Sequence, residues 1–67
     1  MEKMNESGLE ILKGEKLVVV DNLGENTIGF FDFCEGLLKK EYKIITINTY
    51  YTGGRNHWKA VLSIPDK

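Results

Sequence analysis

Two runs of β-branched and aromatic residues near the end of the chain flank a pair of glycines, Gly53 and Gly54. This pattern predicts a β-hairpin over residues 42–64 with a two-residue turn. Counting outward from the glycines gives one apolar face and one mostly polar face, and a slip of one residue would destroy that separation. The predicted pairs are Thr52 with Arg55, Tyr50 with His57, Thr49 with Trp58, Asn48 with Lys59, Ile47 with Ala60, Thr46 with Val61 and Ile45 with Leu62.

Upstream, the continuous apolar run at residues 16–21 predicts a strand with contacts on both of its faces. Residues 27–40 predict the one helix of ordinary length, preceded by Asn26 or Thr27 as the N-cap. Apolar residues recur there at spacings of three and four and form one stripe. The stripe consists of Phe30, Phe31, Cys34, Leu37 and Leu38.

These elements predict an α+β protein of one domain, with a single helix packed on a small mixed sheet. The β-α-β-β core covers residues 15–65, and we expect the spatial strand order 1-3-2, with order 1-2-3 as the alternative. Residues 1–14 are expected to be a loosely ordered or covering extension. Leu9, Ile11 and Leu12 in it could form either one helical turn or a short strand that hairpins onto the next strand.

The composition excludes several kinds of site and partner. With 67 residues, one cysteine and one histidine, the chain can form neither an internal disulfide nor a Cys/His zinc site, and we expect no metal or cofactor. The net charge of −1 provides no overall field that would attract nucleic acid. No apolar run is long enough to span a membrane, and a lone thiol suits a reducing cytoplasm. So small a core also favours a homo-oligomer, most simply a dimer.

No catalytic motif is visible, and we do not expect an enzyme. Cys34 and His57 are the one conceivable thiol pair, but Cys34 lies in the helix stripe while His57 falls on the opposite, outer face of the sheet. Cys34 is therefore predicted to be a buried structural residue.

The tip of the hairpin is the predicted binding site for a partner or ligand. Arg55 is the only arginine of the chain, and exposed Tyr and Arg are typical of binding hot spots. The carboxyl ends of the two parallel strands should bring Asp21, Glu25 and the start of the helix near this tip. The predicted binding residues are Tyr50, Tyr51, Arg55, Asn56, His57 and Lys59.

A second surface is predicted to join copies of the chain. If Leu17 and Val19 face the helix, the outer face of the sheet carries an apolar patch of Val18, Val20, Ile44 and Val61. Apolar patches on small domains mark interfaces. We therefore predict that these four residues form the oligomer interface.

The segments Lys-Leu-Val-Val-Val-Asp, Gly36-Leu-Leu-Lys-Lys and Tyr-Lys-Ile-Ile-Thr-Ile, with the final Ala-Val-Leu strand, resemble a group of very small Firmicute and prophage proteins. The proteins in this group are of the short sporulation-protein type. The resemblance covers residues 16–64 and implies a β-α-β-β fold and a binding or regulatory role in a bacterial host cell. Some phage members of similar size inhibit host defence. No catalytic residue carries over.

The expected function is therefore that of a small non-enzymatic interaction protein that binds and modulates a macromolecular partner, such as a phage-type inhibitor. The alternatives are a binder of a nucleotide or another small anion at an oligomer interface and a nucleic-acid-binding sheet. The latter is disfavoured because the chain is slightly acidic and lacks the Gly and aromatic pattern of RNA-binding sheets.

Overall fold

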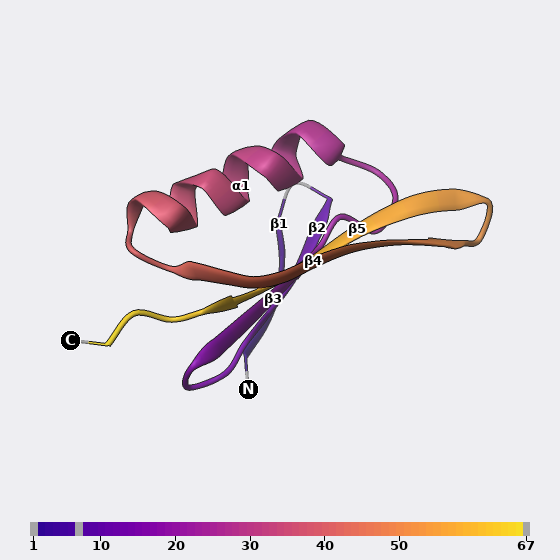
Figure 1. Cartoon of the computed structure of the whole chain (residues 1–67). Helices are drawn as coiled ribbons and strands as arrows, with labels where there is room; N and C mark the ends of the chain where they lie inside the picture. Colours follow the sequence, from indigo (N-terminus) through magenta and orange to yellow (C-terminus); the bar gives the residue numbers. More distant parts are fainter. Residues whose placement is uncertain (1, 7, 67) are drawn as a thin grey trace.

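The computed structural model of the chain describes residues 2–6 and 8–66. The described part consists of three strands, one helix and two further strands along the chain (Figure 1). The elements are β1 (Glu2–Glu6), β2 (Leu9–Lys13), β3 (Leu17–Asp21), α1 (Thr27–Lys39), β4 (Lys43–Thr52) and β5 (Arg55–Ser63).

The strands form one antiparallel sheet in the spatial order β1-β2-β3-β5-β4. The predicted fold class, a β-α-β-β unit with a small mixed sheet, is therefore wrong, because residues 2–13 add two strands beside β3. Leu9 and Ile11 of β2 are buried, which gives this strand an apolar face to place under the helix. The five residues of β1 are all exposed, so β1 joins the sheet mainly through its backbone pairing with β2.

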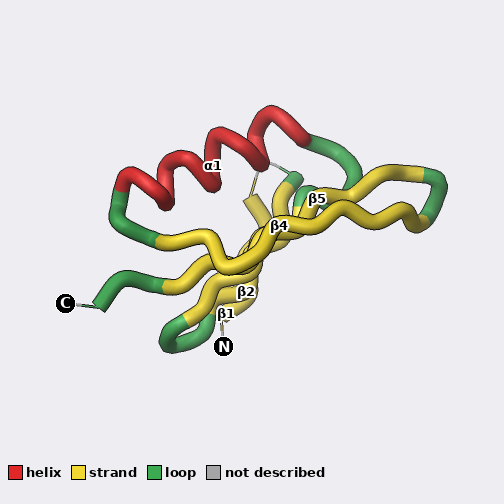
Figure 2. Tube along the Cα trace, viewed as in Figure 1, coloured by secondary structure: helices red, strands yellow, loops and turns green. Residues whose placement is uncertain are grey.

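The helix α1 lies over the face of the sheet that carries the core, as Figure 2 shows. Asn26 caps its N-terminus, as predicted, because the Asn26 Oδ1 accepts a hydrogen bond from the Gly29 backbone N–H (2.8 Å). Phe30 and Cys34, one turn apart, are buried. Cys34 is thus the buried residue that its place in the apolar stripe predicted.

The register of the β4–β5 hairpin is confirmed from the pair Thr52–Arg55 to the pair Thr46–Val61. Gly53 and Gly54 have φ angles of 60° and 78°, the left-handed conformation that a type I′ turn requires at both central positions. The one departure is a β-bulge between Ile44 and Thr46. The partner of Leu62 is therefore Ile44 rather than the predicted Ile45.

The strand β3 faces the opposite way from the prediction. Val18 and Val20 are buried under α1, where they pair with Leu62 and Ala60 of β5, and Leu17 is exposed on the outer face. The run Leu17-Val-Val-Val has no alternation of its own, so its orientation is decided by the neighbouring strand. The buried apolar residues are Leu9, Ile11, Val18, Val20, Phe30, Cys34, Ala60 and Leu62.

The turn end of the β4–β5 hairpin projects past the start of α1 and gives the molecule its long dimension (Figure 1), with overall extents of 41 × 22 × 20 Å. We call residues 50–57 the arm. Tyr51 in the arm has 71% of its surface exposed. Among the described residues, no helix is both long enough and apolar enough to span a membrane.

Candidate functional site

The arm is anchored at the point where β3 ends. Asn22, the residue after β3, is fully buried. Its side-chain Oδ1 accepts hydrogen bonds from the backbone N–H groups of Gly24 (2.9 Å) and Trp58 (2.8 Å), and its Nδ2 donates to the Thr27 hydroxyl (3.3 Å). The Asn22 backbone N–H also donates to the Trp58 carbonyl (3.0 Å). One buried side chain thus connects β5, the loop and the first turn of α1.

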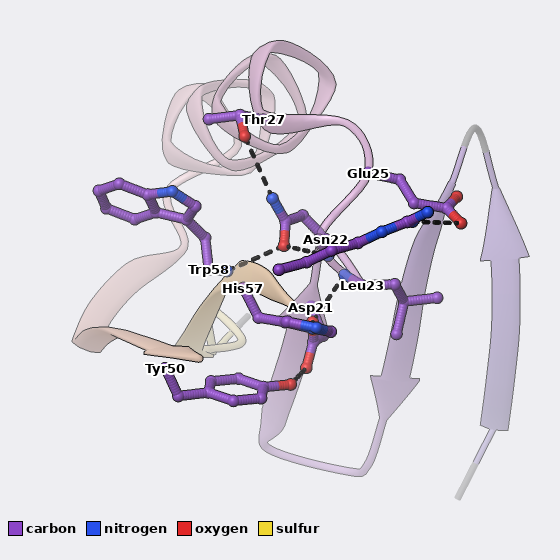
Figure 3. A network of polar contacts seen from close by, with 10 residues as sticks. Asp21, Asn22, Leu23, Glu25, Thr27, Tyr50, His57 and Trp58 are labelled. Atoms are coloured by element: carbon purple, nitrogen blue, oxygen red, sulfur yellow. Dashed lines mark hydrogen bonds and ion pairs between the residues drawn. The ribbon is translucent and has the colours of Figure 1, made fainter. Parts of the chain in front are cut away.

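Asp21 lies on the outer face of the sheet. Its Oδ1 accepts a hydrogen bond from the Leu23 backbone N–H (2.8 Å), and its Oδ2 accepts one from the Tyr50 hydroxyl. The Tyr50 ring stacks on the His57 ring across the hairpin, with centroids 4.7 Å apart and planes at 25°. We call Asp21, Tyr50 and His57 the outer-face cluster (Figure 3). It ties together β3, β4 and β5 at the base of the arm.

The electrostatics of the outer-face cluster keep Tyr50 protonated. The hydrogen bond to the Asp21 carboxylate, followed by desolvation and the negative charge of Asp21, raises the pKa of Tyr50 to about 12. His57 Nδ1 lies 3.6 Å from Asp21 Oδ1, beyond hydrogen-bond distance, and no described residue supplies this buried nitrogen with a hydrogen bond. Stacking and burial therefore hold the imidazole, and the cluster functions as a structural brace.

The loop between β3 and α1 packs closely against β5 because Gly24 has no side chain. A Cβ at Gly24 would lie 2.8 Å from the Arg55 Cβ and 3.2 Å from the His57 Nε2, and the Gly24 φ of 73° also disfavours any other residue. Glu25, next in the loop, pairs with Arg55 at 3.5 Å, and both side chains are more than half exposed. The loop thus positions Arg55 as well as His57.

The predicted binding residues separate into two groups. Tyr50, Arg55, His57 and Lys59 share the outer face, as the cross-strand pairs require. Tyr51 and Asn56 oppose each other on the other face. The structure brings Asp21 to Tyr50 and His57, and Glu25 to Arg55. Tyr51 and Asn56 instead lie out along the arm.

The predicted oligomer interface does not form one surface. Val18 and Val20 belong to the core, so they cannot contribute to an outer patch. Val61 is half-buried on the outer face, and Ile44 is 40% exposed on the edge strand β4. The apolar neighbours of Val61 on the outer face are Val19, its partner in the ladder, and the exposed Leu17.

Cys34 and the other reactive side chains of the described residues do not come together in a catalytic or metal-binding centre. Burial raises the pKa of the Cys34 thiol to about 11, which keeps it in its unreactive protonated form. Cys34 belongs to the core under α1, whereas His57 lies on the outer face, as predicted. Among the described residues there is no cluster of three or more His, Cys, Asp or Glu side chains that could hold a metal ion.

Asn22 and Gly24 are the residues of this site that were not predicted from the sequence. Both stand in the segment Asp21-Asn22-Leu23-Gly24, which its turn residues mark only as a loop. The available signal was the asparagine directly after a buried strand, because asparagine there can bond to nearby backbone groups. Comparison with protein-family models, with curated proteins and with solved structures finds no match to this chain.

Proposed function

We propose that the protein is a small non-enzymatic interaction protein that binds and modulates a protein partner through the arm. The observation that carries the proposal is the projection of the arm beyond α1 (Figure 1). Tyr51, which belongs to the arm, is 71% exposed. Asn56 lies opposite Tyr51 on the same face of the hairpin, and Arg55 lies on the other face. Large exposed Tyr and Arg side chains dominate the energetics of many protein interfaces.

The base of the arm is braced before any partner arrives. The outer-face cluster holds one face of the hairpin, and Asn22 holds the backbone of Trp58. A braced arm loses little conformational entropy on binding, so more of the contact energy becomes affinity. This bracing supports a recognition role for the arm.

The charges of the arm indicate the chemistry of the partner. Arg55 pairs with Glu25 at 3.5 Å, but both side chains are well exposed, and such pairs contribute little stability. Arg55 can therefore exchange Glu25 for a carboxylate of the partner, which its planar guanidinium binds at two points. The partner should therefore contact both faces of the arm, with a depression that receives Tyr51 on one face and an acidic group that reaches Arg55 on the other.

The alternatives have less support. Asn26 already accepts the Gly29 N–H at the start of α1, and the Glu25 carboxylate precedes it, which disfavours an anion there. The Tyr50 and His57 rings stack on each other and the Tyr50 hydroxyl bonds to Asp21, so one face of each ring is already covered, which disfavours stacking with a nucleic-acid base. Inhibition of a host system is the form of modulation that the resemblance to prophage proteins suggests.

Site-specific photocrosslinking in the native host tests the proposal. A photoreactive phenylalanine derivative replaces Tyr51 in one variant and, as the control, Glu15 in the exposed β2–β3 turn. We expect one protein other than the chain itself to be crosslinked from Tyr51 and not from Glu15, and crosslinks between copies of the chain do not count toward this outcome. Adducts to nucleic acid alone, or equal crosslinking from both positions, would overturn the proposal.

The identified partner then permits a measurement of affinity. Tyr51→Ala with Arg55→Ala should weaken binding by at least about tenfold in calorimetry, given the usual cost of removing hot-spot residues. Glu15→Ala is the matched control and should bind like the wild type. Tyr50 is left unchanged because its hydroxyl bonds to Asp21, and its removal would disturb the base of the arm.

A further inference from the structure

One edge of the sheet is open and almost uncharged. β4 is the outermost strand on its side and has ten residues, Lys-Ile-Ile-Thr-Ile-Asn-Thr-Tyr-Tyr-Thr, of which only Lys43 is charged. Ile45 and Tyr51 are 58% and 71% exposed. A long, apolar, uncharged edge strand is a template for pairing with another strand.

The turn geometry shows which backbone groups point outward. In the two-residue turn, the carbonyl of Thr52 faces the N–H of Arg55. Because neighbouring residues of an antiparallel strand direct their N–H and C=O groups to opposite sides, Tyr50 and Asn48 also face β5. The backbone groups of Ile47, Thr49 and Tyr51 therefore face the open edge, where no described strand pairs with them.

The helix adds an apolar stripe above the same edge. Phe31 and Leu38, seven residues apart, lie on one side of α1 and are 40% and 43% exposed. Phe33, on the other side of α1, lines a hollow with Leu9 of β2. The side with Phe31 and Leu38 is therefore directed toward β4, and Ile28, 78% exposed, continues it.

We propose that a second copy of the chain occupies this edge, with the two β4 strands paired antiparallel about a twofold axis perpendicular to the sheet. The sheets then become continuous, and both helices lie on the same face. The stripe of Phe31 and Leu38 faces its equivalent across the axis. The edge pairing and the stripe together form one isologous interface.

The charges of β4 fit a second copy. Antiparallel pairing directs each Lys43 toward the arm of the other copy, away from the other Lys43. With the axis at Ile47 or Asn48, Lys43 lies opposite Tyr51 or Gly53 of the second copy, so no like charges face each other. After pairing, the combined sheet ends on β1 at both sides, where Glu2, Lys3 and Glu6 discourage further growth. The assembly is therefore a closed dimer.

The affinity of one copy of the chain for the other should be modest. The ten residues of β4 and the three of the helix stripe fall short of the roughly 20–30 residues per side in a standard interface. We therefore expect a dissociation constant in the micromolar range, at the weak end of what standard-size interfaces show. Sedimentation equilibrium over a range that brackets this value should show the mass rising from 7.7 kDa to twice that figure. A chain that stays monomeric at the highest concentration would overturn the proposal.

Amide hydrogen exchange identifies the surface. The amides of Ile47, Thr49 and Tyr51 should exchange at least about tenfold more slowly at high than at low protein concentration, because new hydrogen bonds must open before exchange. Asn48 and Tyr50, whose amides face β5, serve as internal controls and should change less. A dimer without this difference would use another surface and would also overturn the proposal.

A matched pair of substitutions tests the edge directly. Thr49→Lys places a charge at the centre of the interface and should give a folded monomer. Asn5→Lys, the same kind of change on the opposite edge β1, should leave the dimer intact. If Thr49→Lys fails to fold, Thr49→Pro removes an outward N–H that the monomer does not use. Equal association of a folded position-49 variant and the wild type would contradict the assignment. These readouts do not depend on the partner of the arm.

Discussion

The two faces of the sheet are stabilised in different ways. Under α1, Val20, Ala60 and Leu62 are completely buried against Phe30. On the outer face Leu17 is 47% exposed. The strands are held there by the hydrogen bond and ring stacking of the outer-face cluster. The comparison indicates that apolar burial on one face supplies most of the stability, while the other face positions the arm.

The apolar core face and the polar outer face are connected at two adjacent residues, Asp21 and Asn22. The alternation of a strand sends Asp21 to the outer face and Asn22 toward the helix, and both carry hydrogen bonds that reach the hairpin. Substitutions on each face test how far the stabilisation of one face is independent of the other.

Phe30→Ala should be the most damaging. It removes the largest fully buried side chain and should lower the free energy of unfolding by about 3–5 kcal/mol, which is comparable to the whole stability of a small domain. Circular dichroism should show a largely unfolded chain at 25 °C. Leu17→Ala on the outer face is the control, with an expected loss below about 1 kcal/mol. Similar losses in the two variants would invalidate the contrast between the faces.

Asn22→Ala should cause the second largest loss of stability. The backbone N–H groups of Gly24 and Trp58 would lose their acceptor inside the structure, and we expect a loss of about 2–3 kcal/mol in urea unfolding. The exposed Asn48 provides the control, because Asn48→Ala should change stability by less than about 0.5 kcal/mol. A loss at Asn22 no larger than that at Asn48 would show that water replaces the buried contacts.

Gly24→Ala should cost about 1–2 kcal/mol, through its left-handed φ and the close approach of Arg55. Gly14→Ala is the matched control. Its Cβ would make ordinary contact at 3.5 Å with the Leu17 carbonyl, and its effect should be near zero. Thermal unfolding of both variants gives the comparison. A Gly24→Ala protein as stable as the wild type would show that the close packing of the loop does not help to position the arm.

The smallest expected effect is the change of stability when Tyr50 ionises at high pH. The pKa of Tyr50 is raised from 10.0 to about 12, so the stabilisation from its neutral hydroxyl is complete below pH 10 and is lost as the pH rises through about 12. Asp21→Asn should return the pKa of Tyr50 toward 10, measured by NMR of the tyrosine ring carbons. Tyr50→Phe, which keeps the ring, identifies the signal. An unchanged pKa in Asp21→Asn would show that the hydrogen bond is not its cause.

The parts of the fold that could be predicted from the sequence are those with strong local signals. Gly53 and Gly54 determine a turn, and the turn determines the register down to the bulge at Ile45. The orientation of β3 was wrong because Leu17-Val-Val-Val looks the same from both faces. β1 was missed because its polar residues add no apolar face. Asn22 could not be found because its partners Thr27 and Trp58 come together only in the folded chain.

The β3–β5 seam also has a consequence for folding kinetics. Its pairs run from Asp21–Lys59 to Leu17–Ser63, a sequence separation of 38 to 46 residues. The other neighbouring strands in the described part of the chain are separated by only two or three residues along the sequence. The N-terminal meander and the β4–β5 hairpin can each form early from local contacts. Closing the long loop that contains α1 is the step that costs chain entropy. The docking of β5 onto β3 should therefore limit the folding rate, and contacts across this seam should already be formed in the transition state.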